Sequence, residues 1–360
     1  MNRLCLRAQW DAAEAFATAA AGHVDGKGLP GYVATQKKAG TDAERAAQYN
    51  AAIPKLATPQ AGEAFKQLEA LHAAGSADVI QILAMQATGE MLPRMGRPRE
   101  GAARLTEAAE RAEAMGWLKK AAMLHLKCAI ASWQASDVPT TARAFDEAYR
   151  LETARGDQVR MATMLSNMAI IDDAIGEHER AIERYKEALA KQEALGDKRG
   201  VALTLGNMAG AQQGMGAMQA ALANLERSLA MRKELGDEEG IAISVAGIGR
   251  HYLTMARSAK ALDHFQRALK LLQRLGKRHN AALVKDSIGR AYIQLGDYAK
   301  ARTAIEQARA EKLVLGDQQG AAKSLATLAE LDSRLGNYER SLERFQEAYE
   351  VAKQSRGRMD

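Results

Sequence analysis

Glycine recurs along this sequence at a spacing of 40 residues that holds without a slip. The series comprises Gly116, Gly156, Gly196, Gly236, Gly276 and Gly316. Halfway between them lies a second series of small residues: Gly176, Gly216, Ala256, Gly296 and Gly336. A fixed period of this length indicates a repeat architecture, in which one supersecondary unit stacks on the next. Each 40-residue repeat therefore holds two segments, and each segment ends in a small residue.

The composition of these segments predicts helices, because alanine, leucine, glutamate, lysine and arginine dominate them. Glycine readily adopts the left-handed conformation that ends a helix, and an aspartate after it can cap the next helix. The aspartates at that position are Asp157, Asp197, Asp237 and Asp317. Three further glycines, Gly200, Gly240 and Gly320, fall in the first turn of a helix, where we expect close approach between helices. The repeat is thus predicted to be a helical hairpin.

Columns of similar residues also recur within the repeats and define the faces that pack. The large residues are Phe145, Tyr185, Leu225, Phe265, Ile305 and Phe345, and small residues lie four positions before and three positions after each of them. Such a small–large–small stripe predicts one helix face that packs closely against a neighbour. An apolar column in the first helix of each repeat comprises Cys128, Met168, Met208, Ile248, Ile288 and Leu328. Cys128 is therefore expected to be a core residue and not a nucleophile.

Two stretches carry a family resemblance: IGRHYLTMARSAKALDHFQRA at 248–268 and IGRAYIQLGDYAKARTAIEQA at 288–308. They resemble tetratricopeptide repeats, whose Leu-Gly-x-x-Tyr pattern is matched by Ile248, Gly249 and Tyr252. The 40-residue period with Leu-Gly-Asp at its joint is similar to the subclass found in Pins/LGN adaptors and kinesin light chains. In three repeats the tyrosine is replaced, by Asp172, Gln212 and Asp332. The resemblance implies an all-α, right-handed α-solenoid of about seven hairpins, over residues 76–355.

The distribution of proline supports a boundary early in the chain. All six prolines lie before residue 140, so the later helices can be continuous. Residues 1–75 do not fit the repeat: we predict a helix over 10–23, a loop over 24–41 and another helix over 61–73. This segment is expected to cap the first hairpin, which would begin near residue 76. Later hairpins would begin near residues 116, 156, 196, 236, 276 and 316, and residues 356–360 would form a tail.

Charge and cysteine content exclude several classes of protein. The net charge is +6, but 50 basic residues alternate with 44 acidic ones and form no polybasic run, so nucleic-acid binding is not indicated. The two cysteines, Cys5 and Cys128, form no CxxC pair, which argues against a disulfide framework. No apolar run has the length of a membrane helix, and no signal peptide is evident. A cytoplasmic protein is expected.

The motifs that usually carry chemistry are missing from the sequence. The stretch GHVDGKG at 22–28 resembles a phosphate-binding loop, but it is one residue short, and Gly28 stands where a serine or threonine would meet magnesium. The seven histidines include no HExxH motif and no pair at i, i+4, so no metal site is expected. Asp172 and Asp173 point in different directions from one helix. We therefore predict no catalytic residue, no cofactor and no enzymatic activity.

The resemblance instead directs attention to the concave wall that the first helices of a solenoid form, where family members hold their partners. The residues predicted to face a partner there are Lys127, Trp133, Asn167, Asn207, Arg250, Arg290 and Glu330. Asparagine amides both donate and accept hydrogen bonds, which suits an extended peptide backbone, and paired arginines suit carboxylates. Two alternatives stay open: these side chains are simply solvated, and Trp133 packs internally.

The function predicted from this pattern is a non-catalytic adaptor that binds an extended or helical, acidic segment of another protein. Two alternatives remain. One is a peptide-sensing regulatory receptor, since the plan of an N-terminal helical segment followed by about seven repeats resembles the response-regulator phosphatases of bacilli. The other is the sensing or docking part of a larger effector protein. Fold alone does not decide between them.

Overall fold

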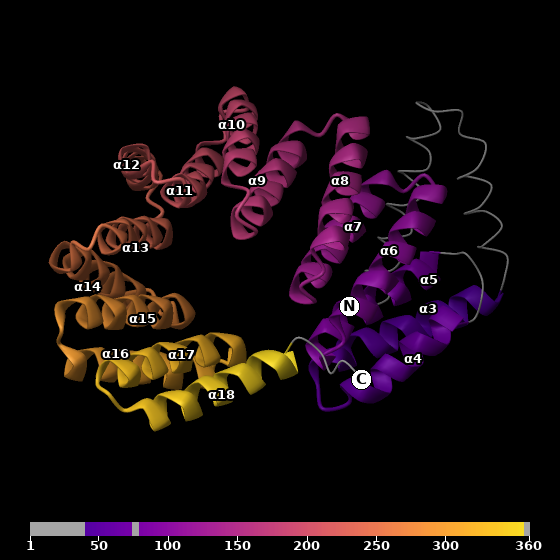
Figure 1. Ribbon diagram of the computed structural model, residues 1–360. Helices are drawn as coiled ribbons and strands as arrows, with labels where there is room; N and C mark the ends of the chain where they lie inside the picture. Colours follow the sequence, from indigo (N-terminus) through magenta and orange to yellow (C-terminus); the bar gives the residue numbers. More distant parts are fainter. Residues whose placement is uncertain (1–39, 74–78, 356–360) are drawn as a thin grey trace. The chain divides into compact units, whose positions relative to one another are not determined.

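The computed structural model describes residues 40–73 and 79–355. These residues form sixteen α-helices and two short 3-10 helices, and they contain no strand (Figure 1). The all-α prediction is therefore confirmed. The helix predicted over 10–23, the phosphate-loop lookalike, most of the loop predicted over 24–41 and the 356–360 tail lie outside the described residues. The same holds for the boundary at residue 75, which stays a prediction.

The chain divides into two compact units that meet between Gly156 and Asp157, which is one of the predicted joints. The helices of the first unit are α3 (Gly40–Ala52), η1 (Ile53–Ala57), α4 (Ala61–Ala73), α5 (Val79–Met91), η2 (Leu92–Met95), α6 (Pro98–Ala114), α7 (Leu118–Gln134) and α8 (Val138–Arg155). The helix predicted over 61–73 is α4. Hairpins α5–α6 and α7–α8 follow it, and each helix packs on the next along the chain.

The second compact unit is a stack of five hairpins. Their first helices are α9 (Gln158–Ala174), α11 (Lys198–Gly214), α13 (Glu238–Thr254), α15 (Arg278–Leu295) and α17 (Gln318–Arg334). Their second helices are α10 (His178–Ala194), α12 (Met218–Glu234), α14 (Ser258–Arg274), α16 (Tyr298–Val314) and α18 (Tyr338–Ser355). Each second helix from α10 to α16 packs both on its own first helix and on the first helix of the next hairpin. This pattern is that of an α-solenoid.

The glycines of both series end helices, as predicted. Gly196, for example, has φ 67°, and every other glycine of the two series also has a positive φ. Its N–H donates to the carbonyl of Glu193 at 3.1 Å, and the N–H of Asp197 reaches the carbonyl of Gln192 at 2.9 Å. These bonds satisfy carbonyl groups that the end of the helix leaves without partners. Ser136 and Ala256 occupy the same repeat position with φ 57° and 56°, a conformation that costs a residue with a Cβ.

The aspartates after the glycines cap the following helices. The carboxylate of Asp237 accepts a hydrogen bond from the N–H of Gly240 at 2.9 Å, and Asp157, Asp197 and Asp317 make the equivalent bond. A Cβ at Gly240 would lie 2.0 Å from a carboxylate oxygen of Asp237 and 2.8 Å from the side chain of Arg232. The glycine therefore makes room for the cap and for a long side chain of the preceding helix. The helix backbones themselves do not cause the crowding, which corrects our expectation for this position.

The predicted columns form the core. The large residues from Phe145 to Ile305 are at most 5% exposed, and Cys128 is fully buried. A Cβ at Gly249 would come within 2.7 Å of the ring of Phe265, so this glycine lets the second helix of the hairpin approach the first closely. Burying a side chain of this size contributes about 1.5–3 kcal/mol, and the repeat provides one in each hairpin.

The position where three repeats lack the family's tyrosine holds buried polar groups. Asp332, on α17, is fully buried and binds Arg302 of α16 at 2.8 Å and Arg344 of α18. Asp172 likewise binds Arg180 and Arg184 of α10. In the repeats that keep the tyrosine, Tyr252 instead stacks on His264, with ring centroids 5.4 Å apart. An ion-pair cluster thus replaces an aromatic contact at the same place in the fold.

We expect Ala256→Gly to stabilise the second compact unit by about 1 kcal/mol, because glycine removes the cost of the left-handed conformation. For a unit of this size, the melting temperature should rise by about 2–4 °C in differential scanning calorimetry. Gly216→Ala, at the equivalent position of the preceding hairpin, should lower it. A lower melting temperature for Ala256→Gly would contradict the account of the turn.

We expect Asp332→Ala to destabilise the protein by about 3 kcal/mol, because it leaves Arg302 and Arg344 without their buried partner. Thermal unfolding followed by circular dichroism measures this loss. Glu330→Ala is the matched control, since Glu330 lies two residues away on the same helix and makes only an exposed ion pair with Arg334. Equal effects of the two substitutions would show that the buried cluster does not stabilise the fold.

Candidate functional site

The first helices of the second compact unit form the inner side of its curve. Consecutive first helices approach one another more closely than consecutive second helices do. Figure 1 shows α11, α13 and α15 on the inner side and α12 and α14 on the outer side. We call the solvent-exposed stripe of these first helices the inner face. Each first helix contributes the same repeat positions to it, so the residues of the inner face recur every 40 positions.

Five of the predicted partner-binding residues lie on first helices of this unit. Asn167 on α9 and Asn207 on α11 are half-buried, while Arg250, Arg290 and Glu330 on α13, α15 and α17 are exposed. The arginines and Glu330 occupy one repeat position, and the asparagines lie three residues before that position in their own helices. The structure therefore places these residues in two rows of the inner face. Whether a partner contacts them stays a prediction.

The other two predicted residues belong to the first compact unit. Lys127, on α7, is half-buried and pairs with Glu90 of α5 at 2.8 Å. Trp133 lies near the end of α7, and 37% of it is exposed, so packing covers most but not all of the ring. Lys127 thus already has a carboxylate partner within the protein, whereas Trp133 keeps an accessible edge.

The cations of the inner face are free to meet a partner. Among the described residues, neither Arg250 nor Arg290 pairs with a carboxylate, and Arg290 donates only a long hydrogen bond of 3.4 Å to Thr327. Burial among the surrounding helices lowers the pKa of Arg250, although its side chain reaches solvent. A guanidinium stays charged at neutral pH even so. A carboxylate brought to this partly desolvated place would bind more strongly than at an open surface.

The structure adds a row of apolar residues that the sequence analysis missed. Leu203, Ile243 and Leu283 are 54%, 41% and 44% exposed, at one repeat position on α11, α13 and α15. Each lies seven residues before the inner-face position of Gly210, Arg250 or Arg290, so it shares a helix face with that position. The sequence carried a signal for them, since leucine and isoleucine recur at this 40-residue spacing beside charged residues. We had treated such recurring apolar residues as core.

The described residues show no arrangement suited to catalysis. They contain no group of three or more histidine, cysteine, aspartate or glutamate side chains placed to hold a metal ion. The thiol of Cys128 lies 3.1 Å from the hydroxyl of Thr106, and burial raises its pKa, so at neutral pH it is a protonated and poorly nucleophilic group. Over the same residues, every helix is too short or too polar to cross a membrane.

Stacked helical hairpins with an exposed inner face define the class of α-solenoid repeat proteins. A family model described as tetratricopeptide repeat matches residues 160–234, 200–274, 241–310 and 280–354. The chain therefore belongs to the tetratricopeptide repeat family, as its sequence predicted. No curated protein matches it.

Solved structures with a similar fold share little sequence with the chain. A Rap protein complexed with Competence and Sporulation Factor is 14% identical, over 96% of both chains, with a TM-score of 0.60. Aspartyl phosphate phosphatase F from Bacillus subtilis is 12% identical, over 95% of this chain and 92% of that one, with a TM-score of 0.59. A signal transduction ATPase with a tetratricopeptide repeat sensor, from Pyrococcus horikoshii, is 16% identical and has a TM-score of 0.51. The match covers 83% of this chain and 47% of the ATPase.

We expect the double substitution Leu203→Asn and Ile243→Asn to leave the melting temperature nearly unchanged, because both side chains are exposed on the inner face. The matched control is Leu205→Asn with Val245→Asn. These residues lie two positions further along the same helices and are 1% and 6% exposed. The control should destabilise the protein by several kcal/mol, since it buries amides in the core. A large loss of stability in the first variant would show that the inner face is covered within the protein.

Proposed function

We propose that the chain is a non-catalytic adaptor whose second compact unit holds a segment of a partner protein on its inner face. The observation that carries this proposal is the row of apolar residues beside arginines that no carboxylate neutralises. Leu203, Ile243 and Leu283 offer apolar area, and Arg250 and Arg290 offer two charges at the same repeat spacing. A segment that carries both apolar and acidic side chains would satisfy both rows.

The geometry of the repeat sets the pattern that such a segment needs. Packed helices lie roughly 10 Å apart, and successive anchors on the inner face are separated by about this distance. An extended segment rises about 3.3 Å per residue, so every third side chain would meet an anchor. A helical segment rises 1.5 Å per residue, so the spacing would be about seven residues. The half-buried amides of Asn167 and Asn207 would favour the extended form, because they can bind a peptide backbone.

A peptide-sensing receptor is the second candidate. The fold similarity to a Rap protein complexed with Competence and Sporulation Factor extends over 96% of both chains and therefore includes the region before the matched repeats. In this alternative the segment would be a free peptide, and its binding would change the arrangement of the two compact units. Small-angle X-ray scattering with and without a selected peptide distinguishes the two functions, since an adaptor need not change shape. We infer no catalytic step in either case.

We expect that selection from a random peptide display library will enrich peptides with aspartate or glutamate and with apolar residues at a spacing of three or seven. Arg250→Glu combined with Arg290→Glu should weaken binding of a synthetic copy of such a peptide at least a hundredfold, because two attractions become repulsions. Fluorescence anisotropy with a labelled peptide measures the dissociation constant.

The matched control reverses two charges on an outer helix, Arg267→Glu and Lys270→Glu on α14, where both side chains are exposed. It changes the net charge by the same amount, so it should weaken binding only slightly. Peptides without acidic residues, or equal losses in the two variants, would refute the proposed face. Circular dichroism of both variants confirms that the fold is kept.

A further inference from the structure

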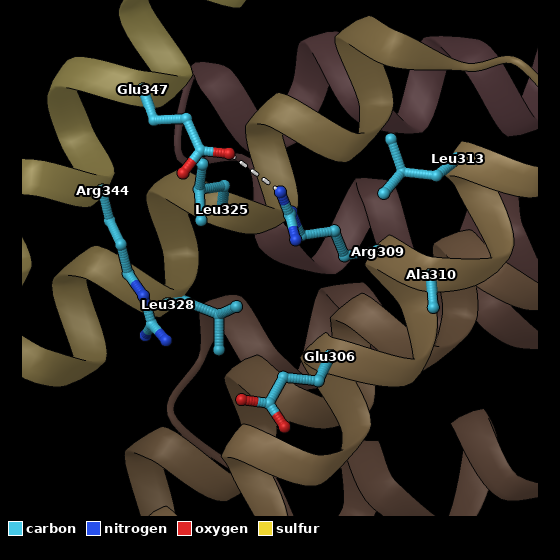
Figure 2. Close-up of a pocket in the computed structure, with 8 residues that line it drawn as sticks. All are labelled: Glu306, Arg309, Ala310, Leu313, Leu325, Leu328, Arg344 and Glu347. Carbon is cyan, nitrogen blue, oxygen red and sulfur yellow. Dashed lines mark hydrogen bonds and ion pairs between the residues drawn. The ribbon is translucent and has the colours of Figure 1, made fainter.

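Two notches open between consecutive second helices, at the same position of the repeat. The first notch lies between α6 and α8, has α7 as its floor, and encloses 530 Å³. The second notch lies between α16 and α18, has α17 as its floor, and encloses 380 Å³ (Figure 2). Lining residues of the two correspond at a separation of 200, or five repeats: Glu110 with Ala310, Glu113 with Leu313, His125 with Leu325, Cys128 with Leu328, and Glu147 with Glu347.

The second notch has an apolar floor, and its charges are matched within the protein. Leu325 and Leu328 form the floor, as Figure 2 shows. On its rim, Arg309 binds Glu347 at 3.0 Å, and Arg344 is held by the buried carboxylate of Asp332. This notch offers a ligand little beyond a small apolar surface.

The first notch has an excess of acid. Four carboxylates line it, those of Glu110, Glu113, Asp146 and Glu147, together with the guanidinium of Arg143. Arg150 binds Glu113 at 2.6 Å and Glu147 at 2.7 Å and so neutralises part of this charge. In the part of the chain that the structure describes, Glu110 and Asp146 make no ion pair or hydrogen bond through their side chains. Both are exposed and therefore available to a ligand.

The floor of the first notch holds a buried histidine without a hydrogen-bond partner among the described residues. The ring of His125 is 5% exposed and lines the cavity. Burial lowers its pKa, against the opposing effect of Glu147, Glu113 and Glu110, so the ring is neutral at pH 7 and one nitrogen is a hydrogen-bond acceptor. A buried polar group without a partner is costly, and a donor entering the notch would remove that cost.

The identity of this residue is unusual for its place in the repeat. Most other repeats have an apolar residue there, namely Leu165, Leu205, Val245 and Leu325. The histidine is therefore not needed to form the hairpin, since a leucine serves the same packing in the second notch.

We propose that the first notch binds a small organic cation through an ammonium or guanidinium head group. The N–H donors of such a group would meet the carboxylates of Glu110 and Asp146 and the free ring nitrogen of His125. A cavity of this volume is within the size range of small-molecule sites. The proposal concerns a different surface from the inner face and does not depend on the function proposed for it.

The probe that tests this site is agmatine, which carries both head groups, added to the full chain in isothermal titration calorimetry. We expect saturable binding with one site per chain. Glu110→Gln with Asp146→Asn should weaken it at least tenfold. Glu306→Gln, on the rim of the second notch, is the matched control and should leave the dissociation constant unchanged. The substituted side chains in the first notch are exposed, so the fold should persist, and circular dichroism verifies this.

A second variant tests the histidine directly. His125→Leu places in the first notch the residue that the second notch has, so we expect it to fold and to bind agmatine at least threefold more weakly. In the wild-type protein, the ring signals of His125 should shift on titration in proton–carbon NMR spectra and should be recognised by their loss in this variant. Unchanged ring signals up to saturating agmatine, or equal affinity of all variants, would overturn the proposal.

The source of the cation is resolved by a further arm of the same experiment. A blocked peptide that contains a single arginine competes with agmatine if the notch accepts the side chain of a partner protein. If only free agmatine binds, the ligand is a small metabolite-like amine. Either outcome supports the cation chemistry. Arg250→Glu with Arg290→Glu should leave agmatine binding intact, which separates this site from the inner face.

Discussion

The structure depends on one backbone constraint, the left-handed residue that ends each helix and reverses the chain. With Gly196 and its equivalents at positive φ, each helix stops at the same length, and the capping aspartate starts the next helix in register. Because every hairpin is cut to the same length, the large residue of each second helix meets a small residue of a first helix, as Phe265 meets Gly249. The core follows from this register, and the inner face and both notches follow from the core.

The part of this arrangement that rests on local rules could be predicted from the sequence. The 40-residue period identified the hairpins, the helix ends, the capping aspartates and the buried columns, since each depends on residues within a few turns of one another. The cluster at Asp332 could not be predicted, because its arginines come from positions 30 residues before and 12 residues after it, on different helices. Periodicity shows that a position is buried but does not show what fills it.

The candidate sites were predicted less completely than the fold, for a related reason. The polar residues of the inner face, Arg250 and Arg290 among them, stood out because charge on a repeating helix face is easily noticed. Its apolar row did not, because Leu203 and Ile243 have the composition of core residues and only their exposure distinguishes them. His125 interrupts an apolar column in the sequence, and that interruption is a signal for the first notch that we had not used.

The pair of notches shows what a repeated backbone allows. The same hollow occurs twice, five repeats apart, with an apolar floor in one place and a histidine with surplus acid in the other. In a linear array each hairpin touches only its neighbours, so substitutions around one hollow leave distant hairpins undisturbed. Duplication therefore provides this chain with spare copies of a cavity, and selection can specialise one copy while the other keeps a purely architectural role.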